Sequence, residues 1–202
     1  MPGKFPCCTW WLTIITPVAL LGCSNGAEMG SRPVHSIAQP TERPETQSQE
    51  SAWVTSEDGS VSLWLLPVET TFEESKPIWV VALLRNKSDK TLNILRPFGD
   101  DYRARAGGIE LRGPKGKLKY TGDIPDYSLG SDSFANVASG KIICDTMELT
   151  VSDFAGSDEP GQYTIVYTYR VTKDDRPSAE KVGFQGIWVG EVKSLPIRVT
   201  KR

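Results

Sequence analysis

The chain has 202 residues, with 23 Lys and Arg against 25 Asp and Glu and a formal net charge of −2. This near balance gives no strong field of either sign, which argues against nucleic acid or an acidic membrane surface as a partner. A hydrophobic content of 39% and a charged content of 24% are typical of a soluble globular protein.

The first 22 residues predict a secretory signal peptide. Lys4 lies in a short leading segment, and the apolar run WWLTIITPVALLG follows at 10–22. This run is too short to cross a hydrocarbon core about 30 Å thick, which needs about 20 helical residues. A cleaved signal peptide therefore explains its length better than a transmembrane anchor does.

The sequence LLGC at 20–23 resembles the lipobox of bacterial lipoproteins. In that family the cysteine carries a thioether-linked diacylglycerol and becomes the first residue after cleavage. The resemblance implies that Cys23 is lipidated and anchors the chain in the cell membrane or the outer membrane, with the rest facing the periplasm or the exterior. Ser24 is compatible with sorting to the outer membrane. The alternative is a secretory signal that ends at a cysteine by chance.

Residues 23–52 predict a disordered tether. The segment is rich in Ser, Pro, Glu and Gln, and it contains one Ile, one Val and no aromatic residue before Trp53. Such a composition buries too little apolar surface to offset its ordering entropy. The single histidine of the chain, His35, lies in this segment, and we interpret it as an incidental linker residue.

Residues 53–202 predict one all-β domain, because short apolar runs alternate with turn residues and no amphipathic helix is evident. Alternation is clear at 61–67 and at 161–171, where Tyr163 and Ile165 would share one face. The run PIWVVALLRN at 77–86 is almost continuously apolar and predicts a strand buried on both faces. Further strands are expected at 89–97, 108–122 (a hairpin that turns at 113–116), 139–151, 183–192 and 194–201.

The last of these strands carries a proline. Leu195, Ile197 and Val199 would point inward, and Pro196 cannot donate a hydrogen bond to a neighbouring strand. We therefore expect 194–201 to lie at the edge of a sheet.

Seven to nine short strands fit an immunoglobulin-like antiparallel β-sandwich. The segments RNKS, PGQYTI and W-x-G-x-V-x-S-x-P, at 85–88, 160–165 and 188–196, resemble the immunoglobulin-like modules of bacterial secreted proteins and the bacterial intracellular proteinase inhibitor family. The step from Glu159 to Tyr163 is similar to the tyrosine corner at the start of strand F. Such turn residues report fold and not function.

Cysteine and tryptophan usage separates this domain from antibody domains. Cys7 and Cys8 leave with the signal and Cys23 is acylated, so Cys144 has no partner for an internal disulfide and is expected to be a reduced thiol. Three tryptophans are expected to pack in the core or at its edge: Trp64, Trp79 and Trp188.

The residue types leave little room for catalysis. A serine or cysteine nucleophile needs a histidine base, and zinc needs histidine or cysteine clusters. The pairs Asp100–Asp101 and Asp174–Asp175 would suit a carboxylate hydrolase but are interpreted as solvated loop charges. The acidic loop 123–132 has oxygen ligands for calcium, without the spacing of a known calcium loop. We expect no cofactor and no metal.

The basic residues of the middle region suggest a binding surface. Arg103 and Arg105 precede the 108–122 hairpin, whose turn carries Lys115 and Lys117. The predicted function is a non-catalytic binding or structural module of the cell envelope, with an envelope protein or a glycan as partner. The alternatives are a proteinase inhibitor, which would present loop 98–107 or 123–137 to a protease cleft, and a hydrolase that uses carboxylates alone.

Overall fold

The computed structural model describes residues 49–73, 76–98, 108–122 and 129–202. They belong to one compact unit, residues 48–202. Its buried apolar side chains extend from Val61 to Val199, so the unit has a core of its own and is expected to fold without residues 1–47. The predicted signal peptide, Cys23 and most of the predicted 23–52 tether lie outside the described residues.

Four antiparallel strands form the first sheet. Their spatial order is β1-β2-β4-β10, and each pair of neighbours is hydrogen-bonded along its length. The strands are β1 (Val54–Thr55), β2 (Val61–Pro67), β4 (Ile78–Asn86) and β10 (Ile142–Leu149).

The second sheet is built around its longest strand. β12 pairs with β14 and β6 along one part of its length and with β13 along another, and the sheet order is β3-β14-β12-β6-β7. The strands are β3 (Thr71–Phe72), β6 (Ile109–Gly113), β7 (Gly116–Lys117), β12 (Gly161–Val171), β13 (Gly190–Lys193) and β14 (Ile197–Lys201). The β6–β7 hairpin turns at residues 114–115, and Gly116, which begins β7, has a φ of +121°, which favours glycine there.

Short strand pairs and helical turns lie outside the two main sheets. β5 (Leu92–Leu95) pairs with β9 (Phe134–Val137), and β8 (Lys119–Tyr120) pairs with β11 (Phe154–Ala155). The helical turns are η1 (Gln49–Ala52), η3 (Ser131–Ser133), η4 (Val151–Asp153), η5 (Lys173–Asp175) and α2 (Arg176–Lys181). No helix within the described ranges is long and apolar enough to cross a membrane.

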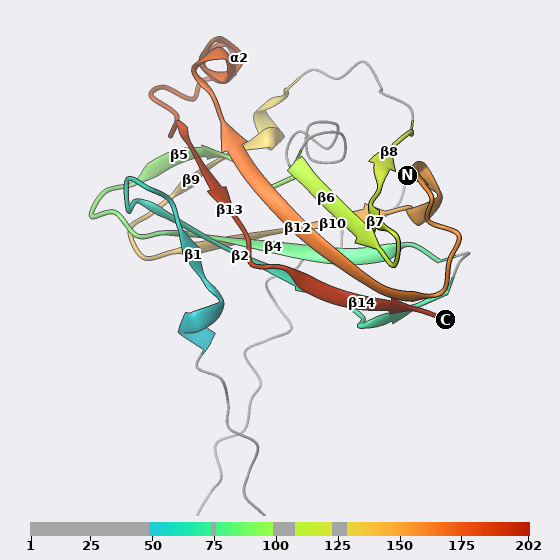
Figure 1. Cartoon of the computed structure of the whole chain (residues 1–202). Helices are drawn as coiled ribbons and strands as arrows, with labels where there is room; N and C mark the ends of the chain where they lie inside the picture. Colours follow the sequence, from blue (N-terminus) through green and yellow to red (C-terminus); the bar gives the residue numbers. More distant parts are fainter. Residues whose placement is uncertain (1–48, 74–75, 99–107, 123–128) are drawn as a thin grey trace, which may run out of the picture. The chain divides into compact units, whose positions relative to one another are not determined.

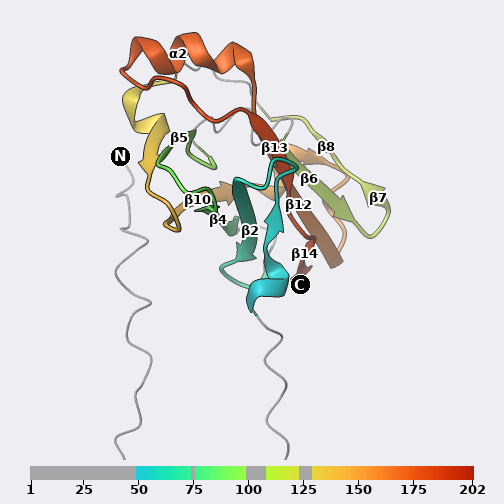
Figure 2. The same cartoon turned by 90° about the vertical axis from the view of Figure 1, so that its left-hand side faces the viewer.

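The order of the strands is that of an immunoglobulin-like sandwich. β2, β4 and β10 occupy the positions of strands A, B and E, while β6, β12 and β14 occupy those of C, F and G. Figure 1 and Figure 2 show the two sheets as separate layers. The described residues contain 14 strands, nine of which have four residues or more, and the expected all-β fold with antiparallel sheets is confirmed.

The core lies between the two sheets and follows the period of two. On β2, Leu63 and Leu65 are buried, and on β12 Tyr163, Ile165 and Tyr167 are buried, while the residues between those on β12 are more exposed. Both strands have the bounds that the sequence pattern predicts. Met147 and Leu149 of β10 are likewise buried side by side on the expected face.

A tyrosine corner fixes the entry to β12. The hydroxyl of Tyr163 donates to the carbonyl oxygens of Ser157 at 2.8 Å and Glu159 at 2.6 Å. The ring is fully buried and packs against Phe72 with the ring centroids 5.6 Å apart. The predicted corner is therefore present at the start of strand F.

The prediction that 77–86 is buried on both faces is wrong. The inward residues of β4 are buried, but the outward ones are not, and Trp79 is 44% exposed. Trp64 is half-buried and only Trp188, at 7% exposure, belongs to the core. Trp53 covers one end of the outer face of this sheet, where its ring centroid lies 5.7 Å from that of Trp64 and 4.8 Å from the Arg85 guanidinium, whereas the face is exposed toward Trp79.

The C-terminal predictions also need correction. The last strand is not an edge strand, because β14 lies between β12 and the short parallel strand β3. Leu195 precedes β14 and is 49% exposed, whereas Val199 is buried as expected. The expected strand at 183–192 is reduced to Gly190–Lys193.

The sequence predicts a solvated loop and no helix after β12. In the structure one of its two carboxylates is buried, and a short helix follows. Asp175 is 1% exposed, and its carboxylate accepts hydrogen bonds from the backbone N–H and hydroxyl of Thr172 at 2.7 and 3.0 Å. This capping box precedes α2, in which Pro177 occupies the first turn and Ala179 is buried. Asp174 remains exposed, as predicted.

Candidate interaction surface

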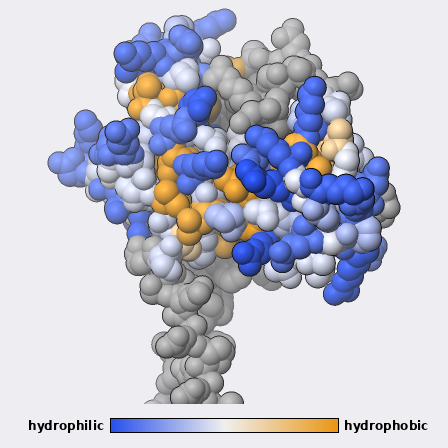
Figure 3. All heavy atoms as spheres, viewed as in Figure 1, coloured by the Kyte–Doolittle hydropathy of each residue, from blue (hydrophilic) through white to orange (hydrophobic). Residues whose placement is uncertain are grey.

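The outer face of the second sheet gathers polar residues from three neighbouring strands. Because Tyr163, Ile165 and Tyr167 of β12 point into the core, Thr164 and Val166 point outward. On β6, Leu111 is buried, so its neighbours lie on the same outer face. Figure 3 shows this side of the molecule, where hydrophilic residues predominate and hydrophobic ones form a smaller band.

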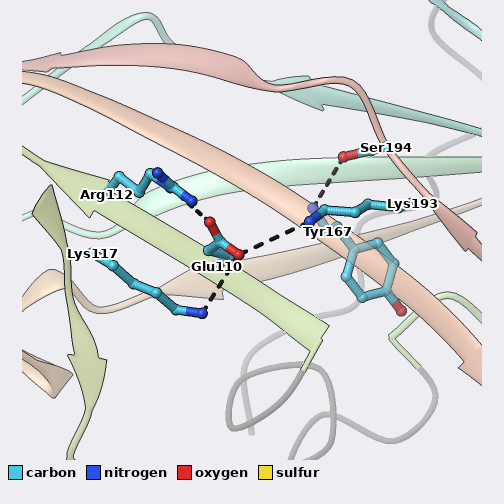
Figure 4. Close-up of polar contacts among 6 residues, drawn as sticks. All are labelled: Glu110, Arg112, Lys117, Tyr167, Lys193 and Ser194. Atoms are coloured by element: carbon cyan, nitrogen blue, oxygen red, sulfur yellow. Dashed lines mark hydrogen bonds and ion pairs between the residues drawn. The ribbon is translucent and has the colours of Figure 1, made fainter.

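Four charged residues form a cluster on this face, which we call the Glu110 cluster: Glu110, Arg112, Lys117 and Lys193. The Arg112 Nε donates to Glu110 Oε1 at 2.6 Å, and the Nζ atoms of Lys117 and Lys193 lie 3.5 and 4.0 Å from Glu110 Oε2. Figure 4 shows the three cations around the one carboxylate. The side chain of Glu110 is 20% exposed and those of the cations are 57–65% exposed.

The electrostatics of the cluster follow from this arrangement. The hydrogen bond from Arg112, together with the charges of Arg112, Lys117 and Lys193, lowers the pKa of Glu110 against the opposing effect of desolvation. One carboxylate cannot neutralise three cations. The cluster therefore presents a net positive charge to solvent.

The backbone places Lys193 beside Glu110. Ser194 follows it and makes two hydrogen bonds with Tyr167: its hydroxyl accepts from the Tyr167 N–H at 3.0 Å, and its own N–H donates to the Tyr167 carbonyl at 2.8 Å. Figure 4 shows the first of these beside the cluster. Ser194 is buried, so this contact holds the end of β13 against β12.

Strand register extends the positive charge across the sheet. Arg112 is opposite Lys117 on one side and Thr164 on the other, and Thr164 is opposite Arg198 of β14. Lys117, Arg112, Thr164 and Arg198 thus form one row that runs across β7, β6, β12 and β14. We call it the cationic row. Neighbouring strands lie about 4.8 Å apart, so the row spans about 15 Å.

The four residues predicted to form a binding surface do not all lie together in the structure. Lys117 lies in the Glu110 cluster. Lys115 lies in the hairpin turn and pairs with Glu159, and this hydrogen bond and charge raise its pKa. Both side chains of that pair are exposed, so it contributes little to stability. Arg103 and Arg105 lie outside the described residues.

Sequence reasoning missed much of the cluster. The two-residue spacing of Glu110 and Arg112 on a predicted strand was a usable signal, because it places both on one face. Lys193 and Arg198 carried no such signal. They reach this face only through the pairing of β13 and β14 with β12, which separates them from Glu110 by more than 80 residues of chain.

A second polar site lies at the end of the sandwich near β1 and β5. It is a hollow of about 430 Å³ whose lining includes Asp58, Ser60, Lys90, Asn93 and Trp188. The Trp188 Nε1 donates to Asp58 Oδ2 at 2.9 Å and to the Ser60 hydroxyl oxygen at 2.8 Å. Asn93 donates to the carbonyl of Gln185 at 2.6 Å. These groups bind one another, so we interpret the hollow as structural.

Asp58 is the electrostatic centre of this network. The hydroxyls of Ser56 and Ser60 each donate to its carboxylate at 2.6 Å. Desolvation alone would raise the pKa of Asp58, but the hydrogen bonds from Ser56, Ser60 and Trp188 outweigh it and hold the pKa well below its usual range.

The candidates for catalysis and metal binding do not assemble in the described ranges. No group of three or more His, Cys, Asp or Glu that could hold a metal ion occurs there. Asp132 of the acidic loop lies in η3, whereas residues 123–128 and the pair Asp100–Asp101 lie outside the described ranges.

The two loops proposed for protease inhibition are only partly described. In the second, residues 134–137 form β9 and pair with β5, so that part is not an exposed loop. In the first, Phe98 is 7% exposed and its ring centroid lies 4.9 Å from that of Tyr167, while residues 99–107 lie outside the described residues.

Comparison with known proteins adds little. No protein-family model and no curated protein matches the sequence. Among solved structures, a β-glucosidase from Erythrobacter marinus is 14% identical, with a TM-score of 0.35 over 71% of this chain and 15% of that chain. A β-glucosidase from Listeria innocua in complex with isofagomine is 12% identical, with a TM-score of 0.34 over 70% of this chain and 16% of that chain. This chain spans less than a fifth of either enzyme, and no inference is drawn from such scores.

Proposed function

We propose that the chain is a lipid-anchored envelope protein whose immunoglobulin-like domain is a non-catalytic binding module for an anionic partner. The LLGC motif supports the anchor through Cys23, and residues 23–52 would supply the tether. The partner would be an acidic segment of an envelope protein or an anionic glycan.

The observation that carries the proposal is the excess positive charge on the outer face of the second sheet. The Glu110 cluster holds three cations around one carboxylate, and the cationic row adds Arg198. Thr164 lies at the centre of the row and supplies a half-exposed hydroxyl between the cations. Guanidinium and ammonium groups at such spacing suit several carboxylates or sulfates of one polymer.

The residue inventory supports a non-catalytic role. General acid–base chemistry near neutral pH most often uses histidine, and the only histidine, His35, lies before the domain. Asp175 and Asp58 have structural partners, since Asp175 closes the capping box of η5 with Thr172 and Asp58 binds Trp188.

Charge reversal tests the proposal. Residues 48–202 with Lys117→Glu and Lys193→Glu should bind immobilised polyglutamate and dextran sulfate at least about tenfold more weakly than the unaltered domain at low salt. Binding of the unaltered domain should also weaken as salt rises, because the charges are exposed.

The matched control reverses two other exposed lysines, Lys173→Glu and Lys181→Glu, in η5 and α2. It changes the net charge by the same amount, so it should retain most of the binding if the effect is local. Equal loss in both variants would reduce the interaction to net charge and contradict a defined site. Turnover of an envelope polymer by the purified domain would contradict the non-catalytic role.

A further inference from the structure

The outer face of the first sheet is apolar along two adjacent strands. Side chains from β2 and β4 lie opposite one another in three successive pairs on this face: Trp64 with Leu83, Leu66 with Val81, and Val68 with Trp79. We call these six residues the apolar face. Val68 and Trp79 are 57% and 44% exposed, and the other four are half-buried.

This arrangement differs from that of an ordinary solvated sheet face. An antiparallel sheet with one face in water normally alternates apolar and polar residues. In β4 the inward residues Val80, Ala82 and Leu84 are buried, yet the outward residues between them are also apolar. Three neighbouring cross-strand pairs of large apolar residues make a continuous patch, and such patches mark interaction surfaces.

The two ends of the apolar face carry opposite charge. Glu148 of β10 lies opposite Trp79 and is exposed on this face, so one end is acidic. At the other end, Arg85 lies two residues beyond Leu83 on the same face of β4, opposite Ile142 of β10, so this end is basic. Arg85 is positioned there by Trp53, because its guanidinium lies 4.8 Å from the ring centroid.

We propose that the apolar face is the interface of a homodimer, in which two copies pack face to face about a two-fold axis that runs across the strands. This axis places the acidic end of one copy over the basic end of the other, at both ends of the interface. A uniform anionic bilayer would attract only one end and repel the other. The charge pattern therefore favours a second copy of the chain over a lipid surface.

The size of the face sets the expected affinity. From Trp79 to Arg85 the strand rises about 20 Å, and β2, β4 and β10 together are about 10 Å wide between the outer strand axes. This area is smaller than that of stable protein interfaces, so we expect a weak dimer with a dissociation constant of about 100 µM or more. The interface lies on the opposite sheet from the Glu110 cluster, so the two sites are tested independently.

Sedimentation velocity of residues 48–202 from about 1 to about 500 µM tests the proposal. The unaltered domain should show concentration-dependent dimerisation, and Trp79→Arg should shift the monomer–dimer equilibrium at least about tenfold toward monomer. The matched control is Leu195→Arg, which changes an equally exposed apolar residue outside the apolar face and should leave the equilibrium unchanged. Far-ultraviolet circular dichroism checks that each variant is folded.

A charge-swap series tests the orientation. Glu148→Lys and Arg85→Glu should each weaken the dimer, and the double variant should restore it, because opposite charges again meet across the two-fold axis. Failure of the double variant to restore dimerisation would overturn the antiparallel arrangement.

A monomer at every concentration, or equal effects of Trp79→Arg and Leu195→Arg, would overturn the homodimer. Flotation with vesicles of phosphatidylcholine, with and without phosphatidylglycerol, tests whether the apolar face binds lipid. Trp79-dependent vesicle binding by a strictly monomeric domain would assign the face to lipid and also contradict the proposal.

Discussion

Asp58 shows how one polar residue joins distant parts of this sandwich. Its carboxylate accepts from Ser56 and Ser60 in the β1–β2 turn and from Trp188, which is 130 residues away. The indole in turn stacks on Tyr169 of β12, with the ring centroids 5.6 Å apart and the planes 7° from parallel. One ionised group therefore ties the segment before β13 to the first sheet.

Replacement of this carboxylate should change the pH dependence of stability. Because the folded-state pKa of Asp58 is lowered, its stabilisation is fully present above the unfolded pKa of about 4 and is lost as pH falls toward the folded value. Asp58→Asn should therefore cost about 1 kcal/mol at pH 7. The difference from the unaltered domain should shrink below about pH 4.

Urea unfolding of residues 48–202 at a series of pH values measures this difference. Asp89→Asn, which changes an exposed carboxylate in the β4–β5 turn, is the control and should have little effect at any pH. A stability difference for Asp58→Asn that persists unchanged to pH 2 would contradict the assigned role of the charged carboxylate.

Residue roles of this kind were the hardest to predict from the sequence. Tyr163 could be assigned because its corner is local and follows Glu159 and Gly161 within a few residues. The contacts of Asp58 with Trp188 and of Lys193 with Glu110 could not, since these partners are remote in the chain. Asp175 was interpreted as a solvated charge because only the fold buries the turn in which its carboxylate accepts from Thr172.

At the scale of elements, period-two alternation predicted β2 and β12 with their observed bounds. The prediction of a strand at 183–192, which rested on its apolar residues, is wrong for most of that range. There Ile187 and Trp188 are buried as an irregular segment packed on the sandwich, and strand pairing starts only at Gly190. Composition alone does not distinguish burial in a loop from burial in a strand.

Gly190 sets this boundary. A Cβ atom at this position would lie 2.3 Å from Cζ2 of the Trp188 ring, so Gly190→Ala must displace the indole or the strand. We expect a loss of about 2–4 kcal/mol in the free energy of unfolding, measured by urea denaturation.

Gly140→Ala provides the comparison for this substitution. Gly140 has a φ of +71° with no atom within 4 Å of the added Cβ, so it should cost only about 1 kcal/mol through backbone strain. A smaller effect at Gly190 than at Gly140 would show that the Trp188 contact does not constrain β13.

At the scale of the whole molecule, the proposed anchor predicts where the chain resides. Cys23→Ala should abolish acylation and cleavage, because the acyl group and the new N-terminus both depend on this cysteine. Membrane fractionation and mass spectrometry of the N-terminus in a bacterial host measure this outcome. A variant that is still cleaved at the same position and still sediments with membranes would contradict the lipobox assignment.

Partner binding is proposed on the outer face of the second sheet, and site-specific photocrosslinking in native membranes tests this proposal. A photoreactive residue in place of Thr164, at the centre of the cationic row, should give a discrete adduct that Lys117→Glu and Lys193→Glu remove. The same group in place of Asp174, exposed in η5, should give none. An equal adduct from both positions, or an adduct at Thr164 that survives the charge reversals, would contradict the account.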